Sequence, residues 1–151
     1  MYLKNCWYVA GWSKDYGREL KAEKYLGENI VIYRKQDGTP VALEDACPHR
    51  KLPLSKGALS EDSIICGYHG LTFNDKGQCS DSPTQRGMMP SRAVVKSYPI
   101  VDKYRLLWIW MGNPELSDPD TIFPIDNFES PTWGYTDGGV MDIKCNYLWV
   151  C

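Results

Sequence analysis

The chain contains 151 residues with 17 basic and 19 acidic side chains, which gives a formal net charge of −2. One domain of ordinary size fills most of that length, and the lack of a basic run argues against nucleic acid as the partner. The longest apolar run, Leu106 to Met111, is too short to span a bilayer, and the opening MYLKNCWYVAGW lacks the features of a signal peptide, so we expect a soluble protein without a membrane segment.

Alternating apolar residues predict strands in the first part of the chain. Residues 5 to 12 are rich in aromatic side chains and predict a strand with Trp7 and Val9 facing a core. Residues 13 to 24 are polar and predict a turn with at most a short irregular helix. The β-branched runs at 30–33 and 41–43 flank an Asp-Gly turn, which is a hairpin signal.

Two short motifs follow this hairpin, and together they contain both histidines of the chain. The first is Cys47-Pro48-His49-Arg50, and the second is Cys66-Gly67-Tyr68-His69. Structural zinc sites usually group like ligands as C-x2-4-C and H-x3-5-H pairs, whereas each motif here holds one cysteine and one histidine. This mixed spacing favours a Rieske-type 2Fe-2S cluster, which has two cysteines on one iron and two histidines on the other.

The predicted ligands, for cofactor and metal alike, are Cys47, His49, Cys66 and His69. Two alternatives remain at this point. The same residues could hold a zinc ion in a zinc-stabilised binding module, or they could be buried thiols and core histidines without a metal. Four such residues falling into this pattern by chance is improbable, which weighs against the second alternative.

Further strands are predicted after the second motif. Residues 71–73 and 78–79 flank a turn and predict a hairpin, and the Pro-, Gly- and Ser-rich stretch 80–90 predicts a surface loop. Residues 94–100 and 105–111 predict two more strands with a turn at Asp102-Lys103. The last strand is apolar on both faces, so we expect both faces to be buried, with Trp108 and Trp110 as core residues. Helical periodicity is scarce, and the predicted fold class is all-β with stacked antiparallel sheets.

The character of the sequence changes after Gly112. Four prolines between positions 114 and 131 indicate little regular structure, and residues 138–150 then begin a new strand pattern. We therefore divide the chain into a cluster-binding domain at 1–112 and a linker with the start of a further domain at 113–151. The remaining cysteines lack close pairing, so free thiols in a reducing cytoplasm are expected.

The stretch DACPHRKLPLSKGALSEDSIICGYHGLTF resembles the Rieske domains of aromatic ring-hydroxylating and O-demethylating oxygenases, at their oxygenase (alpha) component. The resemblance extends to NCWYVAGW, KSYPIVDKYRLLWIWMGNP and KCNYLWV, and it is strongest to monooxygenases similar to vanillate O-demethylase. The respiratory cytochrome bc branch has hydroxyl donors to its cluster where this chain has Leu71 and Phe73. Fewer hydrogen bonds predict a potential near the low end of the Rieske range, which spans about −150 to +300 mV.

The resemblance implies a path for electrons. A reductase component with flavin and iron-sulfur centres would supply them, and a mononuclear non-haem iron in a C-terminal catalytic domain would receive them to oxidise an aromatic substrate. Such an iron needs two histidines and a carboxylate, and both histidines of this chain are already assigned, so we expect no catalytic residues here. The prediction is the N-terminal electron-transfer part of an oxygenase, a homotrimer when full length, with a free-standing Rieske ferredoxin as the alternative.

Overall fold

The computed structural model describes residues 2–83, 93–136 and 138–150. Within these residues every regular element is a strand or a single 3-10 turn, which confirms the all-β prediction. The strands are β1 (Cys6–Trp12), β2 (Lys21–Tyr25), β3 (Glu28–Arg34), β4 (Pro40–Glu44), β5 (Ala58–Ser60), β6 (Ser63–Ile65), β7 (Thr72–Phe73), β8 (Cys79–Asp81), β9 (Ser97–Tyr98), β10 (Ile100–Lys103) and β11 (Leu106–Met111). The 3-10 turns are η1 (Ser13–Asp15), η2 (Leu54–Lys56), η4 (Pro114–Leu116), η5 (Pro119–Thr121), η6 (Asp126–Phe128) and η7 (Tyr147–Trp149). None of the helices described is long and apolar enough to cross a membrane.

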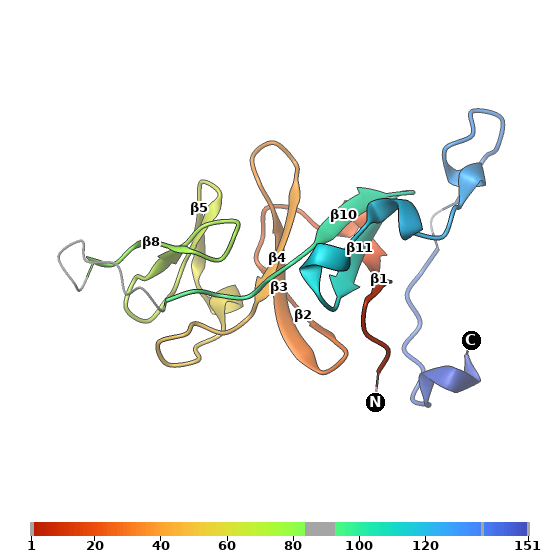
Figure 1. Cartoon of the computed structure of the whole chain (residues 1–151). Coiled ribbons are helices and arrows are strands. Elements are labelled where there is room, and N and C mark those ends of the chain that lie inside the picture. Colours follow the sequence, from red (N-terminus) through yellow and green to blue (C-terminus); the bar gives the residue numbers. More distant parts are fainter. Residues whose placement is uncertain (1, 84–92, 137, 151) are drawn as a thin grey trace.

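The strands form three antiparallel sheets that follow one another along the molecule (Figure 1). One end carries the sheet β5-β6-β7-β8, the middle holds β2-β3-β4-β9, and the other end holds β1-β11-β10. Strand β4 leads from the middle sheet towards the β5–β8 end, and β9 returns the chain to pair with β4. The β5–β8 sheet is therefore an insertion between two strands of the middle sheet.

Strand β3 separates two hydrophobic cores because successive side chains of a strand point to opposite faces. Val31 and Tyr33 belong to the core shared with the β5–β8 sheet, whereas Ile30 and Ile32 belong to the core shared with β11. All four are fully buried. The continuous apolar run of β3 is thus explained by burial on both faces, and the predicted hairpin with β4 is confirmed.

Strand β11 behaves as its sequence predicts. Leu107, Ile109 and Met111 enter the middle core, while Trp108 faces a smaller cluster with Ile122 on the other side. The indole N–H of Trp108 donates to the Lys103 carbonyl at 3.0 Å, so the buried ring keeps its hydrogen bond. Trp108 and Trp110 are core residues, as expected.

Several local predictions were wrong, and each has a physical reason. Residues 21–25 form β2 although they are polar, because this strand pairs only with β3 and keeps one side towards water. Val9 is 47% exposed rather than facing a core, since Tyr8 and Ala10, on the other face of β1, are the residues that pack on the middle core. The turn before β11 lies at Tyr104-Arg105, where both residues have positive φ, and not at Asp102-Lys103. The stretch predicted as one strand at 94–100 is divided between β9 and β10 in two sheets.

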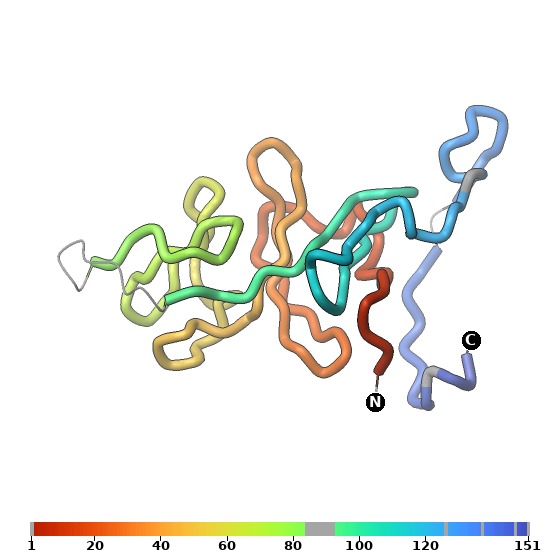
Figure 2. Tube along the Cα trace, viewed as in Figure 1, coloured from red at the N-terminus to blue at the C-terminus, as the bar shows by residue number. Residues whose placement is uncertain are grey.

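The strand predicted for residues 138–150 is absent from that stretch, which holds only the turn η7. Its first residue lies near β1, since a Cβ added to Gly138 would be 3.3 Å from the Trp12 ring, but the segment pairs with no strand of the three described sheets (Figure 2). Val140, Met141 and Trp149 are each more than 80% exposed. A strand needs a neighbour to pair its backbone groups, and the described sheets place none beside this segment.

Glu28 joins three segments of the fold through its carboxylate. It accepts hydrogen bonds from Lys96 Nζ and Tyr98 Oη, each at 2.7 Å, and from Lys4 Nζ. Burial alone would raise the pKa of Glu28, but these three donors outweigh it and lower the pKa from 4.5 to about 2. The ionised form of Glu28 therefore stabilises the folded state.

Replacing Glu28 with glutamine is expected to lower the free energy of unfolding at neutral pH by about 1 kcal/mol, a modest value because the carboxylate is partly exposed and screened. The folded pKa lies below the unfolded one, so this stabilisation is present above about pH 4.5 and is lost as the pH falls through about 2. Urea unfolding at several pH values should show the difference between wild type and Glu28→Gln shrinking in acid. A difference that stays constant down to that pH would contradict the assignment, and Glu19→Gln, at an exposed carboxylate, is the control.

Candidate metal centre

The two predicted motifs form two loops with the same backbone pattern. In the first loop the Lys51 N–H donates to the Cys47 carbonyl and the Cys47 N–H donates to the Leu52 carbonyl, both at 2.8 Å. In the second loop the Gly70 N–H donates to the Cys66 carbonyl at 3.1 Å and the Cys66 N–H donates to the Leu71 carbonyl at 2.8 Å. The two loops are therefore structurally equivalent, with a cysteine opening each turn.

Each loop closes through a residue in the left-handed region of backbone conformation. Gly70 has φ 74° and Lys51 has φ 58° at the equivalent position. A residue with a Cβ in this region costs roughly 1–2 kcal/mol, so the hydrogen bonds that close the first loop must hold Lys51 in place.

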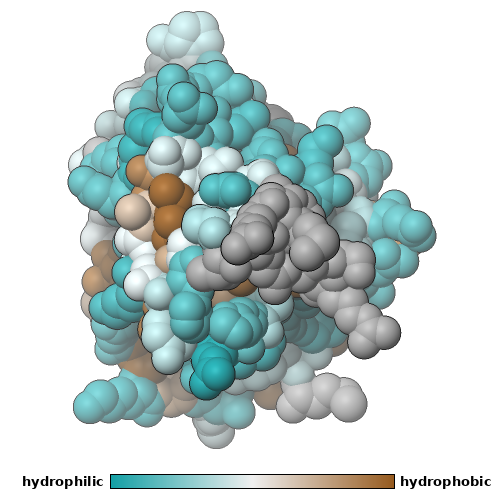
Figure 3. Space-filling model, turned by 90° about the vertical axis from the view of Figure 1, so that its left-hand side faces the viewer, coloured by the Kyte–Doolittle hydropathy of each residue, from teal (hydrophilic) through white to brown (hydrophobic). Residues whose placement is uncertain are grey.

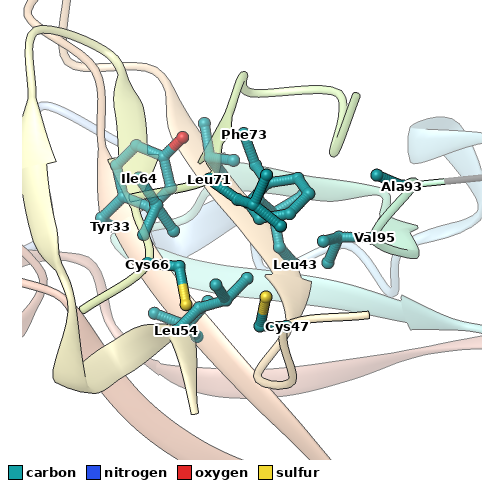
Figure 4. Packing of buried hydrophobic residues seen from close by; sticks show 12 residues of the cluster. Tyr33, Leu43, Cys47, Leu54, Ile64, Cys66, Leu71, Phe73, Ala93 and Val95 are labelled. Carbon is teal, nitrogen blue, oxygen red and sulfur yellow. The ribbon is translucent and has the colours of Figure 1, made fainter. Parts of the chain in front are cut away.

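The two cysteines lie side by side in the core between the loops (Figure 4). Cys47 is 1% exposed and Cys66 is 3% exposed. Burial raises the pKa of the Cys47 thiol; the backbone N–H groups of His49 and Arg50 oppose this rise, whereas the neighbouring Cys66 sulfur adds to it. A positive metal centre between them would supply the charge that ionises such thiols.

The two histidines also lie together, on the side of the two loops that faces away from the buried cysteines. The ring centroids of His49 and His69 are 4.7 Å apart, and His49 is exposed. The Tyr68 ring lies over His69, with centroids 3.9 Å apart, and is itself 56% exposed. The end of the molecule that carries β5–β8 has a mostly hydrophilic surface with a small apolar patch (Figure 3).

One imidazole nitrogen of the predicted site lacks a hydrogen-bond partner within the described part of the protein. His69 Nδ1 is buried and has no hydrogen-bond partner. A buried polar atom without a partner costs about 1–3 kcal/mol, and a metal ion at this nitrogen would remove that cost. The donor set and this orphaned nitrogen fit an iron-sulfur cluster with mixed ligation.

The fold brings the two predicted cysteine ligands together and, separately, the two predicted histidine ligands. Each motif contributes one cysteine and one histidine, yet Cys47 contacts Cys66 and His49 contacts His69. Two like pairs match a binuclear cluster, and a tetrahedral zinc site would need all four residues around one ion.

The sequence interpretation missed the residues that brace the first loop. Asp45 is 7% exposed, and its carboxylate accepts hydrogen bonds from the backbone N–H and the hydroxyl of Ser55, both at 2.7 Å. This contact ties η2 to the end of β4, with the first loop between them. The only signal in the sequence was a pair of small polar residues on either side of the motif.

Replacing Asp45 with alanine is expected to lower the free energy of unfolding by about 2–3 kcal/mol, because hydrogen bonds to a charged acceptor are lost and the Ser55 N–H is left without a partner. Chemical denaturation of the cluster-loaded protein measures this change. Asp37→Ala is the control, since its carboxylate accepts one backbone N–H, from Thr39 at 2.8 Å, in an exposed turn. Equal losses in the two variants would show that Asp45 has no special bracing role.

Comparison with known proteins identifies a family. The family model described as the Rieske 2Fe-2S domain matches residues 6–99. The putative iron-sulfur subunit of a toluene-4-sulfonate monooxygenase system from Comamonas testosteroni is 42% identical over 97% of this chain and 42% of that protein. The vanillate O-demethylase oxygenase subunit of a Pseudomonas species is 37% identical over 97% of this chain and 41% of that protein.

A solved structure agrees with these relatives. The crystal structure of dicamba monooxygenase superimposes with a TM-score of 0.82 at 38% identity, over 86% of this chain and 41% of that one. The chain thus spans about 42% of the length of the curated relatives it matches. The chain belongs to the Rieske 2Fe-2S domain family.

Proposed function

We propose that this chain transfers single electrons through a Rieske 2Fe-2S cluster, with Cys47 and Cys66 on one iron and His49 and His69 on the other. The observation that carries this assignment is the separation of a buried cysteine pair from a histidine pair that reaches the surface. When bound, the cluster supplies a centre that accepts and returns one electron. The histidine edges provide the exit for that electron, because the cysteine side is enclosed by the core.

The protein's own residues keep the site in one geometry. The equivalent turns fix the backbone of both loops, and the N–H groups of His49 and Arg50 point to the Cys47 sulfur and favour its thiolate. Leu54, Leu71 and Phe73 are buried around the cysteines and exclude water from them (Figure 4). A site that changes little on redox cycling needs this kind of rigid support.

The proposed setting is an oxygenase that acts on an aromatic compound by hydroxylation or O-demethylation. A reductase component would deliver the electrons, and a mononuclear non-haem iron in a catalytic domain outside this chain would receive them. The match to oxygenase components continues through almost the whole chain and is not confined to residues 6–99. This favours an oxygenase over a free-standing ferredoxin. The proposed division of the chain, from the change in sequence character after Gly112, is a cluster-binding domain at 1–112 and a linker with the start of the catalytic domain at 113–151.

Assembly and location follow from the same proposal. The resemblance to oxygenases suggests a homotrimer for the full-length protein, and the free cysteines of the described residues fit a reducing cytoplasm. Sequencing the gene beyond codon 151 tests the setting: a frame that continues into two histidines and a carboxylate supports the oxygenase. A stop at that codon supports the separate carrier instead.

A redox titration of the protein, as isolated with its metal, tests the electron-transfer proposal. We expect one electron per chain and a midpoint near the low end of the range of about −150 to +300 mV, since Leu71 and Phe73 offer no hydroxyl donors. A colourless protein containing zinc would overturn the proposal. A clearly positive midpoint would contradict the expected low potential.

A further inference from the structure

Ser82 carries a hydroxyl group that the fold buries without a partner. Its side chain is 0% exposed. In the part of the chain that the structure describes, two buried side-chain nitrogen or oxygen atoms lack a hydrogen-bond partner, His69 Nδ1 and Ser82 Oγ. Leaving a buried hydroxyl unpaired costs about 1–3 kcal/mol, so a partner outside the protein's own atoms is indicated.

Ser82 lies against the second ligand loop. In the β7–β8 ladder Thr72 pairs with Asp81, which places Ser82 across from Leu71, the residue that closes the loop. On the other side of Ser82, the Pro83 ring lies so close to Gly70 that a Cβ added there would be 3.2 Å from Pro83 Cγ. Both neighbours therefore hold Ser82 beside the loop that presents His69.

The hydroxyl is the one group of Ser82 that still needs an acceptor. Its backbone N–H already donates to Asp81 Oδ1 at 2.8 Å. The neighbouring side chains of the loop and sheet, Leu71 and Phe73, are apolar and offer none. His69 Nδ1 lacks a partner that a metal would supply, and Ser82 Oγ lacks an acceptor. A single iron-sulfur cluster bound at the second loop would supply both.

We propose that the Ser82 hydroxyl donates a hydrogen bond to a sulfide of the bound cluster and raises its reduction potential. This inference rests on the proposed function. The sulfides carry more negative charge after reduction, so a hydrogen-bond donor stabilises the reduced state more than the oxidised one. One electron enters the cluster and no proton leaves Ser82. Ser82 would act on the potential of the cluster through this hydrogen bond and would not be a ligand of either iron.

The test is the midpoint potential of the cluster-loaded Ser82→Ala variant. Loss of the hydrogen bond is expected to lower the equilibrium constant for reduction about tenfold, which is about 59 mV for one electron. Ser80→Ala is the matched control, because this serine lies two residues earlier on β8 with an exposed hydroxyl and should leave the potential unchanged. A Ser82→Ala protein with full iron content and the wild-type potential would overturn the proposal.

A second pair of variants decides the question if Ser82→Ala does not retain its cluster. Threonine and valine have the same shape and differ in the hydroxyl, so Ser82→Thr should keep a higher potential than Ser82→Val. Equal potentials in these two variants would also overturn the proposal.

A spectroscopic readout separates hydrogen bonding from packing. The reduced wild-type protein in deuterated water should show an exchangeable deuteron coupled to the cluster that Ser82→Ala lacks, and an identical deuteron spectrum would contradict the hydrogen bond. If the proposed function were wrong, the wild-type protein itself would show no cluster signal. That outcome differs from every result in which wild type holds a cluster and only the effect of Ser82 is absent.

Discussion

Replacing Cys66 with alanine is expected to abolish the visible colour of the protein and its paramagnetic signal on reduction. The side chain is 3% exposed and faces Cys47 in the core. An iron with only one of its two cysteine ligands is not retained, because the buried side chains described around Cys47, such as Leu54, Leu71 and Phe73, are apolar and cannot replace a thiolate. Iron and sulfide analysis of the purified variant measures the loss, which should be close to complete.

Cys79 provides the control within the same chain. It is also partly buried, and burial raises its pKa, but its thiol donates to the Asp81 carbonyl at 3.4 Å and lies outside the two ligand loops. Cys79→Ala should retain two irons and two sulfides per chain, the content of a 2Fe-2S cluster. If Cys66→Ala kept this content as well, the ligand assignment would fail.

Gly57→Ala is expected to have the second large effect, through a steric clash between the end of η2 and the end of β6, just before the second ligand loop. A Cβ on Gly57 would lie 2.2 Å from the Ile65 carbonyl oxygen, directly before Cys66, and 3.0 Å from the Leu54 carbonyl oxygen. Both obstacles are backbone atoms and cannot rotate away. Ile65, the residue before the second ligand loop, would be pushed away from η2, with a loss of about 3 kcal/mol in the free energy of unfolding and a lower iron content.

The matched control is Gly17→Ala, because a Cβ on Gly17 meets no atom within 4 Å and the residue needs no positive φ. Thermal unfolding and iron content should both stay near the wild-type values in that variant. If Gly57→Ala also unfolded at the wild-type temperature with full iron content, the close contact between Gly57 and Ile65 would not be needed for cluster binding.

The strands that could be predicted from the sequence are those buried on one or both faces. The runs that became β3, β4 and β11 alternate or stay apolar, and this pattern depends only on which face meets a core. Strand β2 could not be found this way, because an edge strand with polar side chains is formed by pairing with β3 and not by burial. Residues 138–150 were predicted as a strand because they carry apolar side chains. They form none, because none of the described strands pairs with them.

For the proposed metal centre, the sequence predicted four ligands and the pairing of like residues, and left open the backbone that brings them together. Spacing identified the cysteines and histidines, because short motifs of metal ligands rarely arise by chance. The mixed motifs also favoured a cluster with the cysteines on one iron and the histidines on the other, but they did not show the two equivalent turns by which Cys47 meets Cys66 and His49 meets His69. The contacts of Asp45 and Ser82 depend on pairing between distant segments, and no local pattern predicts them.

The most direct test of the central claim is electron-nuclear double resonance on the reduced protein, with 15N introduced only at histidine. We predict couplings from two inequivalent histidine nitrogens on one iron, because His49 is exposed whereas His69 is half-buried under Tyr68. A spectrum without histidine nitrogen couplings would mean that the cluster has no histidine ligands. The assignment of His49 and His69, and the electron path drawn through them, would then be wrong.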